Sequence, residues 1–314
     1  MNRLVWVTCA SAILLMAGCS SKDKTGGSAR PASPSGAARA EQVAREMRGN
    51  VHCPAKASTD RPAGAPVDDV VGVRPGMTWD EAANFVMCDN PMLVITENTS
   101  RGYNINTYGQ HLRQGFDAKF AEARVVKTSQ QILQDMENDS MRRGANTYVA
   151  PLRPGQVRYF VTTMGRPGEE KALSVAREEY FPTDKLPTVE SVKQALITKY
   201  GEPSQVNGNN LWWEYDPAGG KIAQGSALLG ACSINVSPDA STSLSMNCGV
   251  TVGAVIQPAN ENPGLAHSLA VSSQNGAAGI AILNGTEQAL MAGDAARKTK
   301  ELNAAAKNGQ GPKL

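Results

Sequence analysis

Aromatic side chains are scarce in this sequence, and neither sign of charge is in excess. Phe, Trp and Tyr together make up 5% of the chain, so any core has to be built mainly from Val, Leu, Ile, Met and Ala. Lys and Arg number 31, against 29 Asp and Glu. A protein that binds nucleic acid through its phosphates carries a marked basic surface. The balanced charge therefore predicts no nucleic-acid partner.

Residue patterns of known catalytic centres are also missing. There is no G-x-S-x-G nucleophile elbow, and the one S-x-x-K match, Ser21 to Lys24, lies in a segment too polar to fold. The glycines of Gly276–Gly279 lack the lysine of a phosphate-binding loop. Adjacent acidic residues face different directions on a helix or a strand, so solvated faces or helix N-termini explain them better than acid–base catalysis. Such pairs are Asp68–Asp69, Asp80–Glu81, Glu169–Glu170 and Glu178–Glu179. We therefore expect no catalytic residue and no enzyme activity.

Metal ligands are few and scattered. The three histidines are His52, His111 and His267, and no two cysteines have the C-x-x-C spacing of a metal site. Only His52 stands beside a cysteine, Cys53, and one adjacent pair is not a ligand set. The sequence therefore predicts no metal site and no cofactor.

The N-terminus carries an export signal. Arg3 is followed by an apolar run from Leu4 to Ala17 and then by small residues. The run is about 14 residues long, whereas a bilayer-spanning helix needs roughly 20. The pattern therefore indicates a cleaved signal over residues 1–18 and not a permanent membrane span.

The end of this signal, Leu15-Met16-Ala17-Gly18-Cys19, resembles the lipobox of bacterial lipoproteins. The resemblance implies cleavage between Gly18 and Cys19 and a lipid on the thiol of Cys19. Several acyl chains, each contributing about 0.8 kcal/mol per buried CH₂, would anchor the chain to a membrane. Ser20 follows where inner-membrane lipoproteins tend to have Asp, so the resemblance implies the periplasmic face of the outer membrane. The outer face of the inner membrane is the alternative location, and an ordinary cleaved signal that ends near a cysteine is the alternative reading.

Four cysteines remain when Cys9 leaves with the signal and Cys19 carries the lipid. An even number of cysteines in an oxidising compartment predicts two disulfides, with three ways to pair them. We favour pairing between neighbours in the chain. A bond within the C-terminal pair would close a loop of about 17 residues and contribute about 3 kcal/mol. The four cysteines are Cys53, Cys88, Cys232 and Cys248, and the favoured pairs are Cys53–Cys88 and Cys232–Cys248.

Helical and strand patterns alternate in a way that predicts an α+β fold with antiparallel sheets. Residues 19–40 are rich in Ser, Gly, Ala and Pro and should form a flexible tether. Residues 41–181 and 182–285 should form two helix-plus-sheet units, which could be imperfect repeats of each other. Residues 286–314 should form a C-terminal helix and a tail, with the helix over Thr286–Lys307.

Specific elements follow from periodicity and from capping residues. In the first unit, Gly102–Val126 is mixed and is assigned only loosely. The expected helices are Glu41–Arg48, Thr78 to about Met87, Thr128–Arg143 and Thr188–Tyr200. The expected strands are Leu93–Thr96, Val157–Met164, Ala172–Phe181, Leu211–Tyr215, Ala231–Val236, Gly249–Gln257 and Leu269–Ser272.

Two segments resemble small outer-membrane lipoproteins of the β-barrel assembly machine. TVESVKQALITKYGEPSQVNGNNLWWEYDPAGG, over Thr188–Gly220, is similar to their helix, "LG-x-P" turn and aromatic strand. VGVRPGMTWDEAANFV resembles their "G-M-T-x-x-E" helix start. The chain is larger than those proteins and carries extra cysteines and a C-terminal helix. Tandem units of related topology also occur in secreted inhibitors of β-lactamase, and the whole chain resembles uncharacterised lipoproteins.

The aromatic strand contains two candidate partner-binding residues, Trp212 and Trp213. Successive side chains on a strand point to opposite faces, so one should lie in the core. The other should be covered by a second layer or exposed to a partner, where Trp is a common hot spot.

These patterns predict a membrane-anchored periplasmic lipoprotein that acts as a non-catalytic binding, scaffold or envelope-assembly accessory module. The expected partners are the membrane, through the lipid anchor, and an envelope protein. Two alternatives remain: a lipoprotein enzyme acting on the cell wall or a small periplasmic substrate, and a protein inhibitor of an envelope hydrolase.

Overall fold

The computed structural model describes residues 36–49, 51, 53, 61, 64–97, 103–121, 128–143, 152–234, 236, 243–309 and 311. The chain divides into two compact units, Met1–Pro34 and Ser35–Leu314, and the described residues belong to the second. The expected signal, the lipobox and Cys19 lie outside the described residues.

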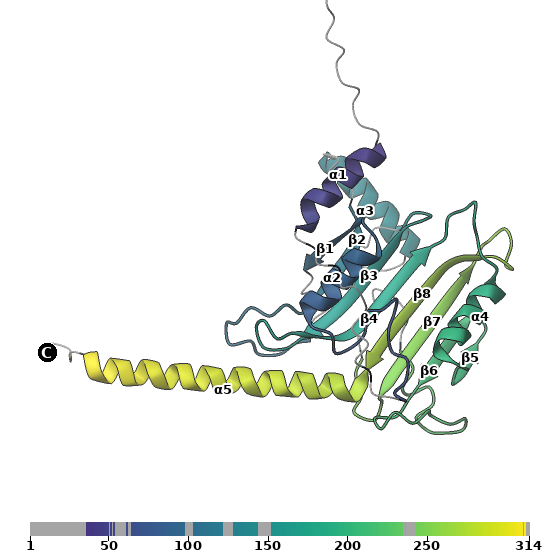
Figure 1. The fold of residues 1–314 in the computed structure, drawn as a ribbon. Coiled ribbons are helices and arrows are strands. Elements are labelled where there is room, and N and C mark those ends of the chain that lie inside the picture. The colour runs from purple at the N-terminus through teal and green to yellow at the C-terminus, as the bar shows by residue number, and fades with distance from the viewer. Residues whose placement is uncertain are drawn as a thin grey trace, which may run out of the picture. The chain divides into compact units, whose positions relative to one another are not determined.

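Eight antiparallel strands form one sheet with the order β1-β2-β3-β4-β8-β7-β6-β5 (Figure 1). The fold is α+β, as the sequence predicts. The strands are β1 (Leu93–Glu97), β2 (Gly115–Phe120), β3 (Val157–Met164), β4 (Lys171–Tyr180), β5 (Gln205–Asn207), β6 (Asn210–Glu214), β7 (Val250–Pro258) and β8 (Ala266–Asn275). The helices are α1 (Gly36–Arg48), α2 (Trp79–Asp89), α3 (Ser129–Arg143), α4 (Val189–Tyr200) and α5 (Gly276–Asn308).

The sheet consists of two halves that repeat one order of elements. In the first half α2 precedes β1 to β4, and in the second half α4 precedes β5 to β8. Each half runs from its edge strand inward, and β4 pairs with β8 at the centre. The threonine that begins each helix bridges to the start of the fourth strand of its half, Thr78 to Lys171 and Thr188 to Leu265. The two halves therefore have the same order of elements and share one continuous sheet.

Side-chain caps define where the two sheet-covering helices begin. Thr78 accepts a hydrogen bond from the N–H of Glu81, and the Glu81 carboxylate accepts one from the N–H of Thr78, so both halves of a capping box are present. In α4, Thr188 accepts from the N–H of Ser191, and Gly201 ends the helix with a φ of 80°. These caps satisfy amide groups that a helix terminus otherwise leaves unpaired.

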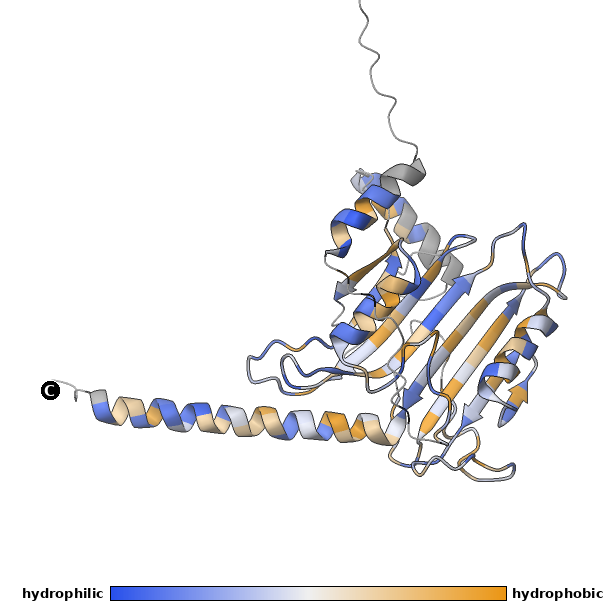
Figure 2. Cartoon of the chain, viewed as in Figure 1, coloured by the Kyte–Doolittle hydropathy of each residue, from blue (hydrophilic) through white to orange (hydrophobic). Residues whose placement is uncertain are grey.

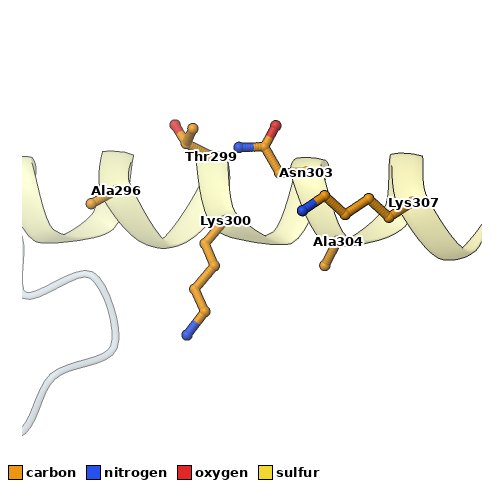
Figure 3. A pocket seen from close by; sticks show the side chains of 6 residues that line it. All are labelled: Ala296, Thr299, Lys300, Asn303, Ala304 and Lys307. Carbon is orange, nitrogen blue, oxygen red and sulfur yellow. The ribbon is translucent and has the colours of Figure 1, made fainter.

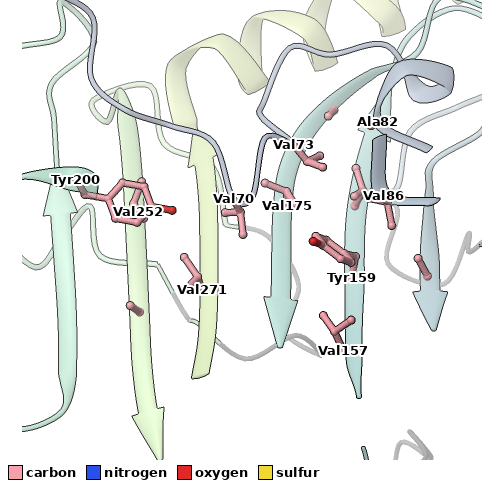
Figure 4. Packing of buried hydrophobic residues seen from close by; sticks show 14 of the residues in the cluster. Val70, Val73, Ala82, Val86, Val157, Tyr159, Val175, Tyr200, Val252 and Val271 are labelled. Carbon is pink, nitrogen blue, oxygen red and sulfur yellow. The ribbon is translucent and has the colours of Figure 1, made fainter. Parts of the chain in front are cut away.

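Both helices pack on the same face of the sheet, over a core rich in valine. A tight turn at Val70–Val73 adds to this core, and Figure 4 shows Val70 and Val73 beside Val175 of β4. Paired backbone hydrogen bonds between Val70 and Val73 leave Val71 and Gly72 at the tip, with φ of 49° and 84°. A β-branched residue such as Val71 rarely adopts a positive φ, so the turn is strained at that residue.

Four sequence expectations need correction. No strand lies in the described part of Ala231–Val236, where turns surround Cys232. Strand β2 lies inside the loosely assigned segment, and α1 begins at Gly36, within the expected tether. Helix α5 begins at Gly276, ten residues before the expected Thr286.

Close packing explains the early start of α5. A β-carbon on Gly276 would lie 2.6 Å from the Ser245 carbonyl oxygen, and one on Gly279 would lie 2.8 Å from Leu244. The amides of Gly276 and Ala277 donate to the carbonyls of Gly249 and Cys248. Tertiary contacts therefore hold a helical turn that two glycines disfavour locally.

Candidate binding surfaces

The four expected cysteines form two disulfides with the favoured pairing. Cys53 bonds to Cys88 at a Cα–Cα distance of 5.6 Å, and Cys232 bonds to Cys248 at 5.5 Å. The first bond fastens the chain before the sheet to α2. The second closes the segment between β6 and β7. Both bonds bring together neighbours in sequence, as predicted.

Trp213 is a core residue. It is 0% exposed, its ring lies 5.1 Å from that of Tyr200, and its indole N–H donates to the Gly201 carbonyl at 2.7 Å. These contacts join β6 to the end of α4. Its buried polar edge has a partner, as an indole in a core requires.

Trp212 points to the opposite face and is half-buried. Its indole N–H donates to the Ile234 carbonyl at 3.1 Å, so the disulfide-closed segment covers part of its ring. Buried Glu214 holds the same segment by accepting hydrogen bonds from the Gly230 N–H and the Ser233 hydroxyl. Whether Trp212 binds a partner stays a prediction.

The adjacent acidic residues do not form acid–base pairs, because neighbouring carboxylates engage different groups. Asp68 pairs with Arg74 at 2.9 Å, whereas Asp69 pairs with Lys199 at 2.7 Å. The other three pairs divide in the same way. Asp80 and Glu170 both bind Arg113, and Glu81 caps α2. Glu169 binds Arg166, Glu178 binds Arg158 and Glu179 binds Arg177. Asp68 and Glu170 are buried, so ion pairing explains these two better than the solvated faces expected from sequence. Asp80 and Glu81 lie in the first turn of α2, where the sequence predicts helix N-terminal charge.

Glu170 is the most enclosed of these carboxylates, at 2% exposure. Burial by itself would raise its pKa. Hydrogen bonds from its own N–H, from Arg113 and from the Gly168 N–H outweigh burial, and the pKa is lowered. Arg113 also lies 4.6 Å from the centre of the Trp79 ring. This cluster joins the β3–β4 turn to the start of α2 and has a structural role.

A second buried network lies on the helix-covered face. The Tyr159 hydroxyl donates to Asp89 at 2.8 Å and accepts from Arg177 at 3.0 Å, and Arg177 also pairs with Glu179. Burial raises the pKa of Tyr159 and, in the neighbouring half, that of Tyr200. Both tyrosines therefore stay protonated and act as hydrogen-bonding core residues.

A polar cleft of about 400 Å³ lies between the segment before α2 and the second half of the sheet. Its walls come from the segment before α2, from the turn after β6, from the start of β7 and from the end of β8. Asp68 is 5% exposed, and its Oδ1 has no hydrogen-bond partner in the described chain. The sequence shows Asp68 only as one of an acidic pair. The other walls of the cleft come from segments far away in sequence, so no motif reveals the cleft.

Helix α5 has a docked half and an exposed half. Leu290 is buried with Leu112, Met164 and Leu173, and Ile282 packs against the same cluster. From Ala295 to Lys307 every side chain is exposed. We call Ala295–Lys307 the arm. Figure 2 shows that hydrophilic residues recur along the arm, and Figure 3 is a close view of six of its side chains. A shallow depression on that side is lined by Ala296, Thr299, Lys300, Asn303, Ala304 and Lys307.

The described residues also bear on the histidines, on metal sites and on membrane-spanning helices. His111 lies beside Glu97 and His267 beside Tyr180, whereas His52 falls outside the described part. Across the residues that the structure describes, no three His, Cys, Asp or Glu side chains gather as a metal site would require. Over the same residues, no helix is both long and apolar enough to span a bilayer.

Comparison of the chain with protein-family models, with curated proteins and with solved structures found no match.

Proposed function

We propose that this chain is a lipid-anchored protein of the bacterial envelope that faces the periplasm and acts by binding. It would serve as a scaffold or assembly accessory for another envelope protein, without catalysing a reaction. The observation that carries this proposal is the arm, a stretch of helix whose side chains are all exposed in the described chain.

The arm is a preformed helix available to a partner. It is roughly 20 Å long at the rise of an α-helix, and an isolated helix of that length is marginal in water. Here the docked half supplies the nucleus, and Asp294 pairs with Arg297 and Lys298 while Arg297 also pairs with Glu301. A partner that binds an already ordered helix loses less conformational entropy on binding.

Two large apolar side chains stand exposed along α5. Met291 and Leu302 are 55% and 71% exposed and lie about three helical turns apart, so they share one side. Helices that bind in a groove use apolar anchors at such whole-turn spacings. The arm, together with Met291 one turn before it, therefore supports recognition of a grooved protein surface.

The distribution of carboxylates supports a non-catalytic role. Each adjacent acidic pair is divided among separate cations or caps, and Glu170 is held by the Arg113 guanidinium and by the N–H groups of Arg113 and Gly168. A general acid or base needs an oxygen that can exchange a proton with substrate. Carboxylates locked in ion pairs favour structure over proton transfer.

The location rests on the N-terminal pattern. An acylated Cys19 would hold the chain at the outer membrane, facing the periplasm, with the outer face of the inner membrane as the alternative. The chain after Cys19 would reach a protein partner near that surface. Its balanced charge gives no reason to expect a nucleic-acid partner.

Cross-linking and affinity capture of the lipidated full chain from envelopes would test this proposal. We expect one envelope protein to be captured stoichiometrically, and a chain ending after Lys298 to lose it. Ala305→Pro should also lose it, because proline breaks a helix at a cost of about 3 kcal/mol, whereas Ala305→Ser should retain it. Absence of any stable envelope partner would contradict the proposal. Equal capture by the shortened chain would show that another surface binds, and turnover of cell-wall fragments or inhibition of an envelope hydrolase would favour the alternatives.

A further inference from the structure

Helix α3 carries an apolar patch that the described chain leaves exposed. Ile132, Leu133 and Met136 are 47%, 65% and 47% exposed, and every other described side chain of α3 is exposed as well. At about 100° per residue, these three side chains lie within an arc of about 100°, and Gln131 and Gln134 lie on the opposite side of the helix. Helix α3 is therefore amphipathic, with a short apolar side turned to solvent.

The patch is confined to little more than one helical turn. Its residues occupy positions i, i+1 and i+4, whereas a helix that binds in a protein groove places apolar anchors over two or more turns. A short apolar patch suits shallow insertion, about 5–10 Å deep, at the boundary between lipid headgroups and acyl chains. Charge adds little, because the sequence of α3 contains three acidic and two basic residues. These features favour a lipid surface over a protein groove.

The chain connections bring this patch within reach of the proposed lipid anchor. Cys19 lies about 17 residues before Gly36, the first residue of α1, and a chain of this Ser-, Gly- and Ala-containing composition has a root-mean-square span of about 23 Å. Ala44 of α1 packs with Val94 of β1 and with Ala121 after β2. Helix α3 begins about eight residues after Ala121, a span of at most about 28 Å. A lipid surface that holds Cys19 is therefore close enough for α3 to meet it.

We infer that α3 lies on the lipid surface that holds the anchor, with Ile132, Leu133 and Met136 inserted among the lipids. The inference rests on the lipid anchor of the proposed function, because three side chains are too few to hold the chain on a membrane by themselves. The anchor supplies the attachment, and α3 fixes which side of the first half faces the lipid. The arm, Ala295–Lys307, is a separate helical segment and stays available to a protein partner.

Hydrogen exchange of the lipidated chain in phosphatidylcholine vesicles would test this contact. We expect the amides of Ile132–Met136 to exchange about tenfold more slowly in vesicles than in the soluble Cys19→Ser chain. Leu133→Asp should abolish the slowing, because it places a charge among the lipids, while mass spectrometry still finds the lipid on Cys19. The Leu133 side chain is exposed, so the melting temperature should not change. The matched control is Met246→Asp, at a side chain that is 68% exposed and lies outside α3, which should keep the slowing.

A second measurement separates this contact from the anchor. The mature chain from residue 19 onward, made with Cys19→Ser and therefore without lipid, is mixed with phosphatidylcholine vesicles at millimolar lipid and sedimented. We expect weak binding that Leu133→Asp reduces about tenfold and that Met246→Asp leaves unchanged. The binding should be insensitive to salt, because opposite charges on the lipid and the helix do not drive it.

Unchanged exchange at Ile132–Met136 in vesicles, with the lipid present on Cys19, would overturn the inference. Slowing that survives Leu133→Asp would do the same, as would vesicle binding that is lost only when the arm is shortened. Protection of α3 that requires a captured envelope protein would make the patch a protein site instead. An unmodified Cys19 would remove the anchor, and the vesicle titration would still decide the contact, so the two proposals can fail separately.

Discussion

At the scale of single residues, neighbours in sequence have unrelated roles because a strand sends them to opposite faces. Trp213, on β6, is buried against α4, whereas Trp212 is partly covered by the segment that the Cys232–Cys248 bond closes. In the irregular segment before Val70, neighbouring residues also separate: Asp68 binds Arg74, whereas Asp69 binds Lys199.

The tryptophans give a first prediction. Trp213→Ala should lower the free energy of unfolding by about 3–5 kcal/mol, because it empties a core site and leaves the Gly201 carbonyl unpaired. Trp212→Ala should cost less than half as much. Urea unfolding midpoints would measure both, with Trp213→Phe as the conservative control. Equal losses would contradict the assignment of Trp213 to the core, and weaker partner capture by Trp212→Ala would establish Trp212 as a hot spot.

Glu170 gives a prediction about pH. Its pKa is lowered in the folded chain, so its contribution to stability is fully present above the usual carboxyl pKa of 4.5 and is lost as pH falls through the lower folded value. Unfolding free energy measured from pH 7 to pH 2 should therefore fall on the acid side. Glu170→Gln should be less stable at neutral pH and should have a flatter acid limb, whereas exposed Glu202→Gln should match the parent. An unchanged acid limb in Glu170→Gln would count against the buried ion pair.

Val71 gives a prediction of increased stability. It is 39% exposed and holds a φ of 49° at the tip of a two-residue turn before Gly72. Asn followed by Gly is the preferred sequence for such a turn, so Val71→Asn should stabilise the fold by about 1 kcal/mol. Thermal unfolding would measure the gain, and Val71→Ile should show none. A destabilised Val71→Asn would mean that the Val71 side chain contributes more by contact than it costs in strain.

At the scale of elements, each half inserts a long segment between its second and third strands. In the first half this segment contains α3, whose Ile132, Leu133 and Met136 are exposed. In the second half the Cys232–Cys248 bond draws the segment onto the sheet beside Trp212. The covalent bond explains why one insertion covers its half of the sheet.

Removing this bond should loosen that cover. The Cys232→Ala/Cys248→Ala variant should lose about 3 kcal/mol and exchange the Trp212 indole N–H faster, because Ile234 no longer holds it. Hydrogen-exchange NMR would follow the indole signal. The Cys53→Ala/Cys88→Ala variant should leave that signal protected, and protection in both variants would show that the Glu214 hydrogen bonds suffice.

At the scale of the whole molecule, the chain is predicted to connect a lipid surface to a binding domain. Cys19→Ser should release the protein from membranes, because the acyl chains that supply the apolar burial can no longer be attached. Fractionation and mass spectrometry of the membrane fraction would show this. Recovery of the parent chain with an unmodified Cys19 or an intact signal would remove the anchor from the proposed function.

Many elements of the fold were predictable because they depend on local chemistry. The Thr78–Glu81 capping pair, the apolar spacing of α4 and the turn between Val157–Met164 and Ala172–Phe181 each lie within a few turns or one hairpin. Strand β2 was missed although Phe116, Ala118 and Phe120 alternate with Asp117 and Lys119, the pattern of a strand with one buried face. The Ala231–Val236 expectation was wrong because tertiary contacts and a disulfide, not strand pairing, hold that segment.

Some of the candidate sites likewise depend on local sequence, and others depend on contacts between distant segments. Both disulfides follow from cysteine number and proximity in sequence. The cleft could not be predicted, because its walls come from widely separated segments, which contain Asp68, Asp216 and Asn275. The arm was expected as a helix, but its exposure was not, since a helix rich in Ala, Lys and Glu can dock or stand free.

The sequence by itself determined the export signal pattern, the helix caps, the hairpin between β3 and β4 and the expected number of disulfides, because these depend on residue type or on residues close together in the chain. Only the tertiary structure decided that β4 pairs with β8 to join the halves, that a polar cleft forms between the segment before α2 and the second half, and that the arm lies outside the core. Those features arise from contacts between distant segments. Their free energies depend on which surfaces meet and are not encoded in any single stretch of sequence.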